Sequence, residues 1–328
     1  MFNLLLKKQN IMKKTLVLMA SAAMLLLGAS CTKEGVFNPK EKIAKISESS
    51  LSVSTYSYDG QSYTESDTTP KHLTQEWKWD DNLLTTITNY HQEYGLLEDE
   101  PTTVVSSVLT LTYDGKQLVK VSDASGQNYS NYTYDGNKLT KIESYEEGQL
   151  RSTAEITHDG KKIAQVVVTT YEVEGKASDA TRFALSTIMP NKRVLDKVLA
   201  NSAKATTTQT QTLDFTFDGG NVTKIDMTYG EENITLEYTY DKNKNPFYGC
   251  YAALGEEGFT ALSENNILSE KSTEVYTRDG ATRTYTYTTN YEYEYDGKFP
   301  TTVSTTSTYT SDNYSEKRTH TTYYEYAE

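Results

Sequence analysis

The sequence predicts an all-β protein in which repeated antiparallel hairpins form a long curled meander or an open barrel-like sheet, with one or two short covering helices. Three observations predict this fold. An aromatic-Asp-Gly turn recurs along the chain, stretches of Tyr and Thr alternate with a period of two, and the chain has 27 Tyr although hydrophobic residues make up only 36%. Tyr and Thr are typical of pleated, half-buried sheet surface, so Tyr must supply much of the buried area.

The repeated unit is an aromatic-Asp-Gly turn followed at fixed spacing by two apolar residues. Adjacent copies start 21 (113 to 134), 24 (134 to 158) or 23 (217 to 240) residues apart, the length of two strands with their turns. Each unit is therefore predicted to be one hairpin. Weaker copies begin at Trp79 and Tyr295, and Tyr58 and Tyr240 keep only the turn. Four copies match fully: Tyr113-Asp114-Gly115 with Leu118 and Val121, Tyr134-Asp135-Gly136 with Leu139 and Ile142, His158-Asp159-Gly160 with Ile163 and Val166, and Phe217-Asp218-Gly219 with Val222 and Ile225.

The residues of the unit have separate physical roles. Gly tolerates the positive φ of a tight turn and Asp can bond downstream backbone amides, so these aspartates are predicted to be turn formers rather than catalytic acids. The two apolar residues are three apart and would lie on opposite faces of a regular strand. Either a β-bulge re-aims one of them or both faces are partly covered, and we expect partial cover of both faces.

Two stretches interrupt the repeat. Residues 178–204, with Pro190 near a helix start, have helical spacing and place four apolar residues on one face: Val194, Leu195, Val198 and Leu199. This helix is expected to cover the sheet, with a ligand lid as the alternative. Residues 245–267 are expected to be a loop with a short helix, which either walls an apolar pocket or covers one end of the sheet.

The first thirty residues are predicted to be a lipoprotein signal peptide. A basic pair, Lys13-Lys14, precedes a mostly apolar run of 13 residues that is too short to span a bilayer as a helix. Cys31 follows two small residues, which resembles the acylation site of bacterial lipoproteins, so Cys31 is the predicted lipidation site. Translation is expected to start at Met12 rather than Met1.

The mature chain is expected to be acidic and without disulfides. Removal of residues 1–30 takes away four lysines and leaves 28 basic against 45 acidic residues, which makes nucleic acid and anionic membrane surfaces poor candidates as partners. Cys250, the only other cysteine, is predicted to be a buried apolar residue rather than a nucleophile. We expect a tether at residues 31–50 and a single β-repeat domain at 51–328. The protein would be held at the outer membrane through Cys31, and the sequence does not distinguish the periplasmic face from the cell surface.

Some residues resemble a known family. The stretch from Tyr240 to Phe247 and the run Ser263-Glu264-Asn265-Asn266 are similar to Bacteroidetes lipoproteins of the family DUF4595, and the repeats resemble the YD repeats of Rhs-type proteins. The similarity covers roughly residues 75–270. The resemblance implies a β-rich binding fold with a porphyrin-type ligand such as haem, and it supplies no fixed ligand motif for residues of this chain.

The sequence contains no familiar catalytic or metal-binding motif. Adjacent acids such as Glu146-Glu147 are predicted to be solvated. A glycoside hydrolase is nevertheless an alternative, because its two carboxylates need only be close in space. The chain has four histidines that could hold a haem iron: His72, His91, His158 and His320. Each is expected to be an ordinary strand or turn residue. No catalytic, cofactor-binding or metal-binding residue is therefore assigned.

The predicted function is a non-enzymatic binding module of the cell envelope. It would capture a porphyrin, another planar or amphipathic small molecule, or a glycan on tyrosine-lined sheet surface. The alternative is a structural lipoprotein that meets protein or glycan partners through an extended surface. A small-molecule binder should have one concave pocket, whereas an interaction protein should have an open patch.

Overall fold

The computed structural model describes residues 41–58, 61–93, 102–171, 176–189, 191–204, 208–248, 262–278, 281–311 and 314–327. The chain divides into a unit Met1–Lys33, outside these ranges, and a unit Glu34–Glu328 that contains every element described below. The predicted signal peptide, Cys31 and Cys250 lie outside the described residues.

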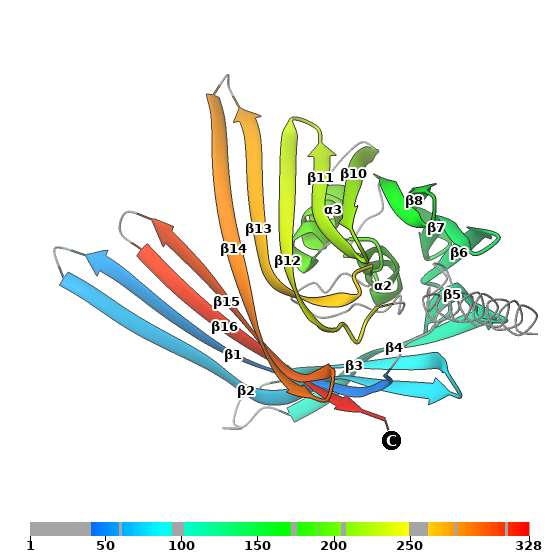
Figure 1. Ribbon diagram of the computed structural model, residues 1–328, viewed down its shortest axis with the longest axis horizontal. Coiled ribbons are helices and arrows are strands. Elements are labelled where there is room, and N and C mark those ends of the chain that lie inside the picture. Colours follow the sequence, from blue (N-terminus) through cyan, green and yellow to red (C-terminus); the bar gives the residue numbers. More distant parts are fainter. Residues whose placement is uncertain are drawn as a thin grey trace, which may run out of the picture. The chain divides into compact units, whose positions relative to one another are not determined.

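Antiparallel strands form one closed barrel (Figure 1). Strands adjacent in sequence pair with each other, and β1 also pairs with β16. The sheet is therefore closed, whereas the sequence predicted a curled meander or an open barrel-like sheet. The all-β prediction is confirmed. The sixteen strands in the described residues are β1 Ile43–Tyr58, β2 Gln61–Asp80, β3 Leu83–Glu93, β4 Thr102–Asp114, β5 Gln117–Asp123, β6 Tyr129–Asp135, β7 Lys138–Glu146, β8 Gln149–Asp159, β9 Lys162–Thr170, β10 Gln209–Asp218, β11 Asn221–Tyr229, β12 Glu232–Lys244, β13 Asn265–Arg278, β14 Ala281–Asp296, β15 Phe299–Ser311 and β16 Tyr314–Tyr326.

The predicted domain boundary at residue 51 is too late. β1 begins at Ile43, so residues 43–50 belong to the barrel wall rather than to a tether. Ile43 and Ile46 are each only 1% exposed. The prediction failed because the rest of this strand is rich in Ser, which gives no apolar alternation along the chain.

Between β9 and β10 the chain forms two helices, α2 (Asp179–Ser186) and α3 (Lys192–Lys204). Both pack against the inner face of the barrel wall. The predicted helical stretch is therefore confirmed as two short helices. Ser178 caps α2, with its hydroxyl accepting from the Thr181 amide, and α2 contacts strands β4 to β8. The predicted apolar face of α3 is buried, with exposures of 1–4%: Val194, Leu195, Val198 and Leu199. No helix in the described part of the chain is long and apolar enough to cross a membrane.

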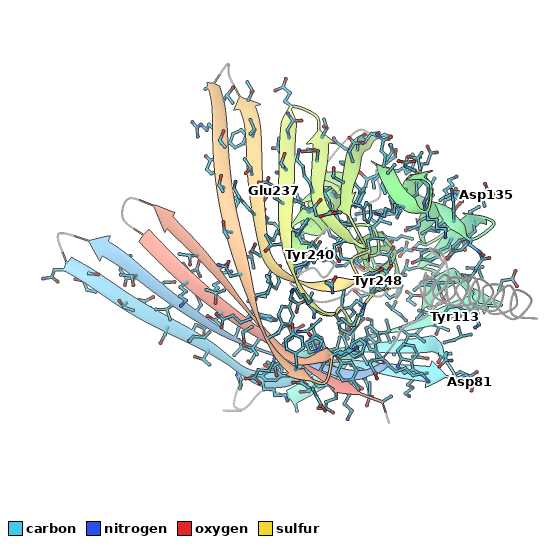
Figure 2. All side chains as sticks on the ribbon, in the orientation of Figure 1. Asp81, Tyr113, Asp135, Glu237, Tyr240 and Tyr248 are labelled. Atoms are coloured by element: carbon cyan, nitrogen blue, oxygen red, sulfur yellow. The ribbon has the colours of Figure 1, made fainter. Side chains whose placement is uncertain are left out.

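The turns of the repeat have the predicted backbone. Gly136 has a φ of 59°, and the glycine that follows Asp in the other described Asp-Gly turns also has a positive φ. Asp81 occupies the equivalent place after Trp79 with a φ of 50°, which Asp tolerates better than most residues. Asp81 and Asp135 lie exposed at the ends of hairpins (Figure 2), as expected for residues that form turns.

A β-bulge follows the turn in each copy of the repeat that keeps both downstream positions. Between β6 and β7 the register shifts, so Thr140 has no opposite residue in β6. The extra residue turns both apolar positions inward, since Leu139 is 3% exposed and Ile142 is fully buried. The expected partial cover of both faces is therefore wrong, and the bulge explains the spacing of three. The same shift follows Trp79, Tyr113, His158, Phe217 and Tyr295.

The aromatic residue of the turn is held by a hydrogen bond to the preceding strand. The Tyr134 hydroxyl donates to the carbonyl of Leu118, the first apolar residue of the unit before it, at 2.9 Å. At Phe217 the ring has no hydroxyl, and the Lys162 ammonium lies 5.1 Å from the ring centroid. The same kind of contact occurs at four other turn positions: Trp79 with the Ile43 carbonyl, Tyr113 with Leu84, His158 with Leu139 and Tyr240 with Val222. The turn residue Tyr295 instead donates to the Asp241 carboxylate. Tyr293 and Tyr326, which are not turn residues of the repeat, donate to the carbonyls of Ile267 and Pro300.

Buried and exposed residues alternate along the wall strands. Leu236 is fully buried, whereas its neighbour Glu237 on β12 is exposed (Figure 2). Glu237 pairs with Lys271 of β13 at 3.4 Å, and both side chains are 53% exposed. Leu213 and Asp214 repeat this contrast on β10. The wall thus has an apolar inner face against the helices and a polar, charged outer face.

The matched substitutions Tyr134→Phe and Phe217→Tyr test the aromatic hydrogen bond. Tyr134→Phe is expected to lower the free energy of unfolding by about 0.5–1.5 kcal/mol, because the Leu118 carbonyl loses its donor. Phe217→Tyr adds a hydroxyl that can donate to the Ile163 carbonyl, which takes the place of the Leu118 carbonyl in this hairpin. It should raise the free energy of unfolding by up to the same amount. Urea denaturation midpoints measure both changes. Equal midpoints for the native chain and Tyr134→Phe would contradict the role given to this bond.

Candidate functional site

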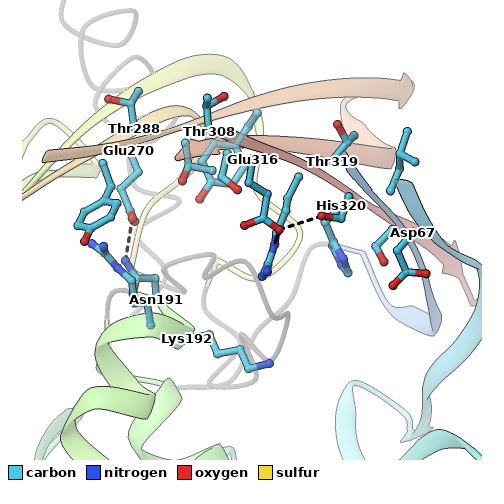
Figure 3. A pocket seen from close by; sticks show the side chains of 18 of the residues that line it. Asp67, Asn191, Lys192, Glu270, Thr288, Thr308, Glu316, Thr319 and His320 are labelled. Atoms are coloured by element: carbon cyan, nitrogen blue, oxygen red, sulfur yellow. Dashed lines mark hydrogen bonds and ion pairs between the residues drawn. The ribbon is translucent and has the colours of Figure 1, made fainter. Parts of the chain in front are cut away.

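A cavity of about 1030 Å³ lies inside the barrel between the start of α3 and strands β1, β2 and β13 to β16 (Figure 3). Hydroxyl, carboxylate and basic side chains line it together with two tyrosines, Tyr287 and Tyr291. This polar lining contrasts with the apolar packing around α2. The cavity is concave, as the sequence predicts for a small-molecule binder, but its lining is far less aromatic than expected.

Barrel closure brings distant residues together at the cavity. Ser50 pairs with His320 across the β1–β16 seam, and Ser52 pairs with Arg318. The Ser52 hydroxyl donates to Glu316 at 2.9 Å, and Arg318 contacts the same carboxylate at 2.6 Å. At the cavity, alternate residues of the two seam strands therefore face the lumen with polar side chains, such as Ser50 and Ser52 on β1.

The first turns of α3 place cations opposite acids of the wall. The Arg193 guanidinium lies 3.2 Å from Glu274 of β13. The Lys197 ammonium lies 2.6 Å from Glu232 of β12 and 3.7 Å from Glu274. These ion pairs fix α3 to the wall at β12 and β13. The lining holds four basic residues and four acids, so it has no excess of either charge: Lys192, Arg193, Lys197 and Arg318 against Asp67, Glu270, Glu274 and Glu316.

Glu270 is the most buried acid of the cavity wall. Its side chain accepts a hydrogen bond from the Asn191 amide at 2.8 Å, and Asn191 also caps α3 by accepting from the Val194 amide at 2.8 Å (Figure 3). Burial raises the pKa of Glu270, although Asn191, Arg193 and Tyr238 favour its charged form. Burial and the neighbouring Glu270 likewise raise the pKa of Tyr238 well above its ordinary value.

Aromatic side chains form a packed layer inside the barrel beside the cavity. Phe247 is 1% exposed and meets Trp77 and Tyr324 edge to face, at centroid distances of 6.2 and 5.7 Å. Phe247 belongs to the second break in the repeat, so the described part of that stretch packs inside the barrel. Residues 249–261 of this stretch lie outside the described residues, so the predicted short helix stays a prediction.

The histidines do not gather at one place. Of the four, only His320 lines the cavity, where its Nε2 lies 3.6 Å from the Glu48 carboxylate. His158 takes the aromatic position of a repeat, as predicted, and its Nε2 lies 2.8 Å from the Leu139 carbonyl. His72 contacts the Pro70 carbonyl, and His91 is exposed beside Glu93. Among the described residues no three metal-ligating side chains come together.

The prediction that Glu146 is solvated is wrong. Glu146 is 6% exposed, and one of its oxygens accepts from the Ser178 amide at 2.7 Å and the Thr181 hydroxyl at 3.0 Å. Its other oxygen lies 3.6 Å from the fully buried Arg151. A carboxylate at a helix N-terminus is stabilised by the helix dipole, so Glu146 anchors α2 to the wall. The sequence signal was the position of Glu146 at the inward-facing end of β7, before the turn residue Glu147.

No protein-family model matches the sequence, and no curated protein matches it significantly. Among solved structures, a porin-like protein from Bacteroides uniformis is similar at 13% identity, covering 87% of this chain and 98% of that one, with a TM-score of 0.49. A porin-like protein from Bacteroides vulgatus is 9% identical, with coverages of 88% and 99% and a TM-score of 0.41. OccK2 (OpdF) of Pseudomonas aeruginosa is 8% identical, with coverages of 88% and 99% and a TM-score of 0.30. Because these TM-scores lie below 0.5, they identify neither a family nor a function for this chain.

Glu270→Gln tests the burial of this acid through pH dependence. Between the ordinary pKa of 4.5 and the raised value, the folded protein binds more protons than the unfolded chain, so stability falls as pH rises. The Gln side chain keeps an oxygen that can accept the hydrogen bond from Asn191, but it has no carboxyl group to titrate. Glu270→Gln should therefore be more stable than the native chain at pH 7, with the difference shrinking towards pH 4.5. Thermal unfolding midpoints across this range measure it, and a difference independent of pH would refute the assignment.

Proposed function

We propose that this protein is a non-enzymatic binding protein of the bacterial cell envelope that holds a polar small molecule in the barrel lumen. The observation that carries the proposal is the cavity of about 1030 Å³, a size typical of ligand pockets. Its hydroxyls, amide and charged groups suit a ligand with many hydrogen-bonding groups. Tyr287, the more exposed of the two lining tyrosines, adds a flat face to the same wall.

The cavity glutamates support a binding role over hydrolysis. Glu274 is paired with Arg193 and Lys197, and Glu316 with Ser52 and Arg318. Each of these carboxylates is thereby fixed as part of the wall. The glycoside hydrolase alternative needs two carboxyl groups, one acting as acid and the other as base or nucleophile. Of the cavity acids, Glu274 and Glu316 are held by cations, and Glu270 is buried with Asn191 as its hydrogen-bond donor.

Haem is a second candidate ligand. The resemblance to DUF4595 implies a porphyrin-type ligand, and His320 is the one histidine of the four that lines the cavity. Basic side chains at the start of α3 lie on the opposite wall, where they would suit the carboxylates of a porphyrin. The polar lining favours a hydroxyl-rich ligand over a large apolar ring, so haem takes second place.

Binding is tested with the full-length protein in a polyoxyethylene detergent, which carries no sugar. The protein is titrated calorimetrically with neutral and acidic oligosaccharides, haem and iron-free protoporphyrin. We expect saturable one-to-one binding of a sugar that Ser52→Trp abolishes by filling the cavity. Val53→Trp, on the outer face of the same strand, should leave binding unchanged. Binding of haem with a His320-dependent Soret shift would favour the second candidate, and binding that survives Ser52→Trp would exclude the cavity as the site.

We further propose that the protein is held at the outer membrane by acylation of Cys31, with the barrel in water. The outer wall carries Glu155, Asp214, Glu237 and Lys271 as exposed residues. A wall strand in hydrocarbon has the opposite pattern, with apolar residues outward, and a Lys or Arg at the bilayer centre costs about 2–4 kcal/mol. The polar outer face therefore supports a lipid anchor rather than insertion of the barrel.

Cys31→Ser is expected to move the protein from the membrane fraction to the supernatant after cell lysis, because the anchor is lost. Cys250→Ser, which leaves the anchor in place, should keep the native distribution. Fractionation with an alkaline carbonate wash measures both variants. If Cys31→Ser stays with the washed membranes, the barrel itself is inserted and the anchoring proposal is wrong.

A further inference from the structure

The inner face of β14 carries tyrosines that lead from the barrel mouth to the cavity. Tyr285 pairs with Glu274 and Tyr287 with Ser272, and Ser272 is 1% exposed on the inner face of β13. Tyr285 and Tyr287 therefore face the lumen. Exposure decreases along this line, from 38% at Tyr285 to 4% at Tyr291. We call these three residues, Tyr285, Tyr287 and Tyr291, the tyrosine track.

The outer end of the track is built as a stacked pair. Tyr276 and Tyr285 stack with centroids 5.4 Å apart and rings 4° from parallel, and the Tyr276 hydroxyl donates to Tyr285 at 2.9 Å. A similar pair, Tyr56 and Tyr63, stacks at 5.4 Å on the hairpin of β1 and β2, with Tyr63 41% exposed. Because the strands are antiparallel and pair in sequence order, the turns after β1 and after β13 lie at the same end of the barrel, although in Figure 1 the first hairpin extends to the left and the second upward. Preformed pairs hold their rings in place at little further entropy cost when a ligand binds.

The inner end of the track joins aromatic faces to polar groups. The Arg193 guanidinium lies 4.4 Å from the Tyr287 centroid and also pairs with Glu274. From Tyr285 to Tyr291 the strand rises about 20 Å, at about 3.3 Å per residue. A ligand that follows the track must therefore be elongated, must offer flat C–H faces for the rings, and must carry hydroxyls for the polar wall. Linear oligosaccharides have these three properties.

We propose that the ligand of the cavity is a linear oligosaccharide, which lies along the tyrosine track with one end in the cavity and the other at the Tyr276–Tyr285 pair. This inference rests on the proposed binding function and names its ligand class. The cavity holds the terminal sugar by hydrogen bonds, and the track adds one stacking contact for each further ring that reaches it. Affinity therefore increases with chain length until the chain reaches Tyr285.

The test uses linear glucose, chitin and mannose oligomers of two, four and seven units, titrated calorimetrically against the full-length protein. The four- and seven-unit chains should bind more tightly than the two-unit chain. Tyr285→Ala should weaken the longest chain by about 3- to 10-fold, as expected for one aromatic stacking contact, and leave the two-unit chain unchanged. Tyr323→Ala, on the outer face of β16, is the matched control and should change neither.

The outcomes separate the track from the cavity. If short and long chains bind equally and Tyr285→Ala has no effect, the track proposal is wrong while the cavity still binds sugar. If no oligomer of any length binds, both the sugar assignment and the proposed hydroxyl-rich ligand fail. A loss of two-unit binding in Tyr285→Ala would also overturn the track, since that change would act inside the cavity. Circular dichroism of both variants confirms that the barrel is intact.

Discussion

The β-bulge that follows the turn in six hairpins of the repeat is the constraint on which the barrel depends. A regular strand would send the two apolar residues of the repeat to opposite faces, and the bulge sends both inward. Bulges also increase strand twist, and this one recurs in six hairpins of the described chain. The bulged residue is Thr in four of them, where its hydroxyl donates to the carbonyl seven residues earlier: Thr85, Thr140, Thr223 and Thr301. The accumulated curvature brings β16 to β1 and closes the sheet.

Closure divides the interior into two parts with different chemistry. Where α2 lies, the lumen is a packed core held by the buried pair of Glu146 and Arg151. Beyond α3, the inner faces of β1 and β13 to β16 become polar and enclose the cavity. Asn191 stands at this boundary, because it caps α3 on one side and donates to Glu270 on the other. The helices thus fill one part of the barrel and define one wall of the space left in the other.

Local periodicity was enough to predict the hairpins, the positive-φ turns and the helical stretch, because each depends on residues close in sequence. Closure and the cavity depend on contacts such as that of Ser52 with Glu316, which no local pattern reveals. The alternation of polar and apolar residues also failed to show which face of β1 is the inner one, because its inner residues Glu48 and Ser50 are as polar as residues of an outer face. Most tyrosines of the repeat turned out to brace neighbouring strands through their hydroxyls, as Tyr134 does, rather than to line a pocket. The sequence signal for this bracing role was the fixed position of a polar aromatic residue directly before Asp-Gly.

Closure of the barrel between β1 and β16 is the claim on which the lumen, the cavity and the proposed function all rest. Ser49 and Thr321 are opposite each other on the outer face of this seam. In a chain with Cys31 and Cys250 replaced by Ser, the pair Ser49→Cys and Thr321→Cys should form a disulfide under mild oxidation. The pair Ser49→Cys and Lys317→Cys, offset along the same strand, should not. A disulfide specific to the first pair is the result that closure predicts, and equal or absent cross-linking in the two variants would contradict it.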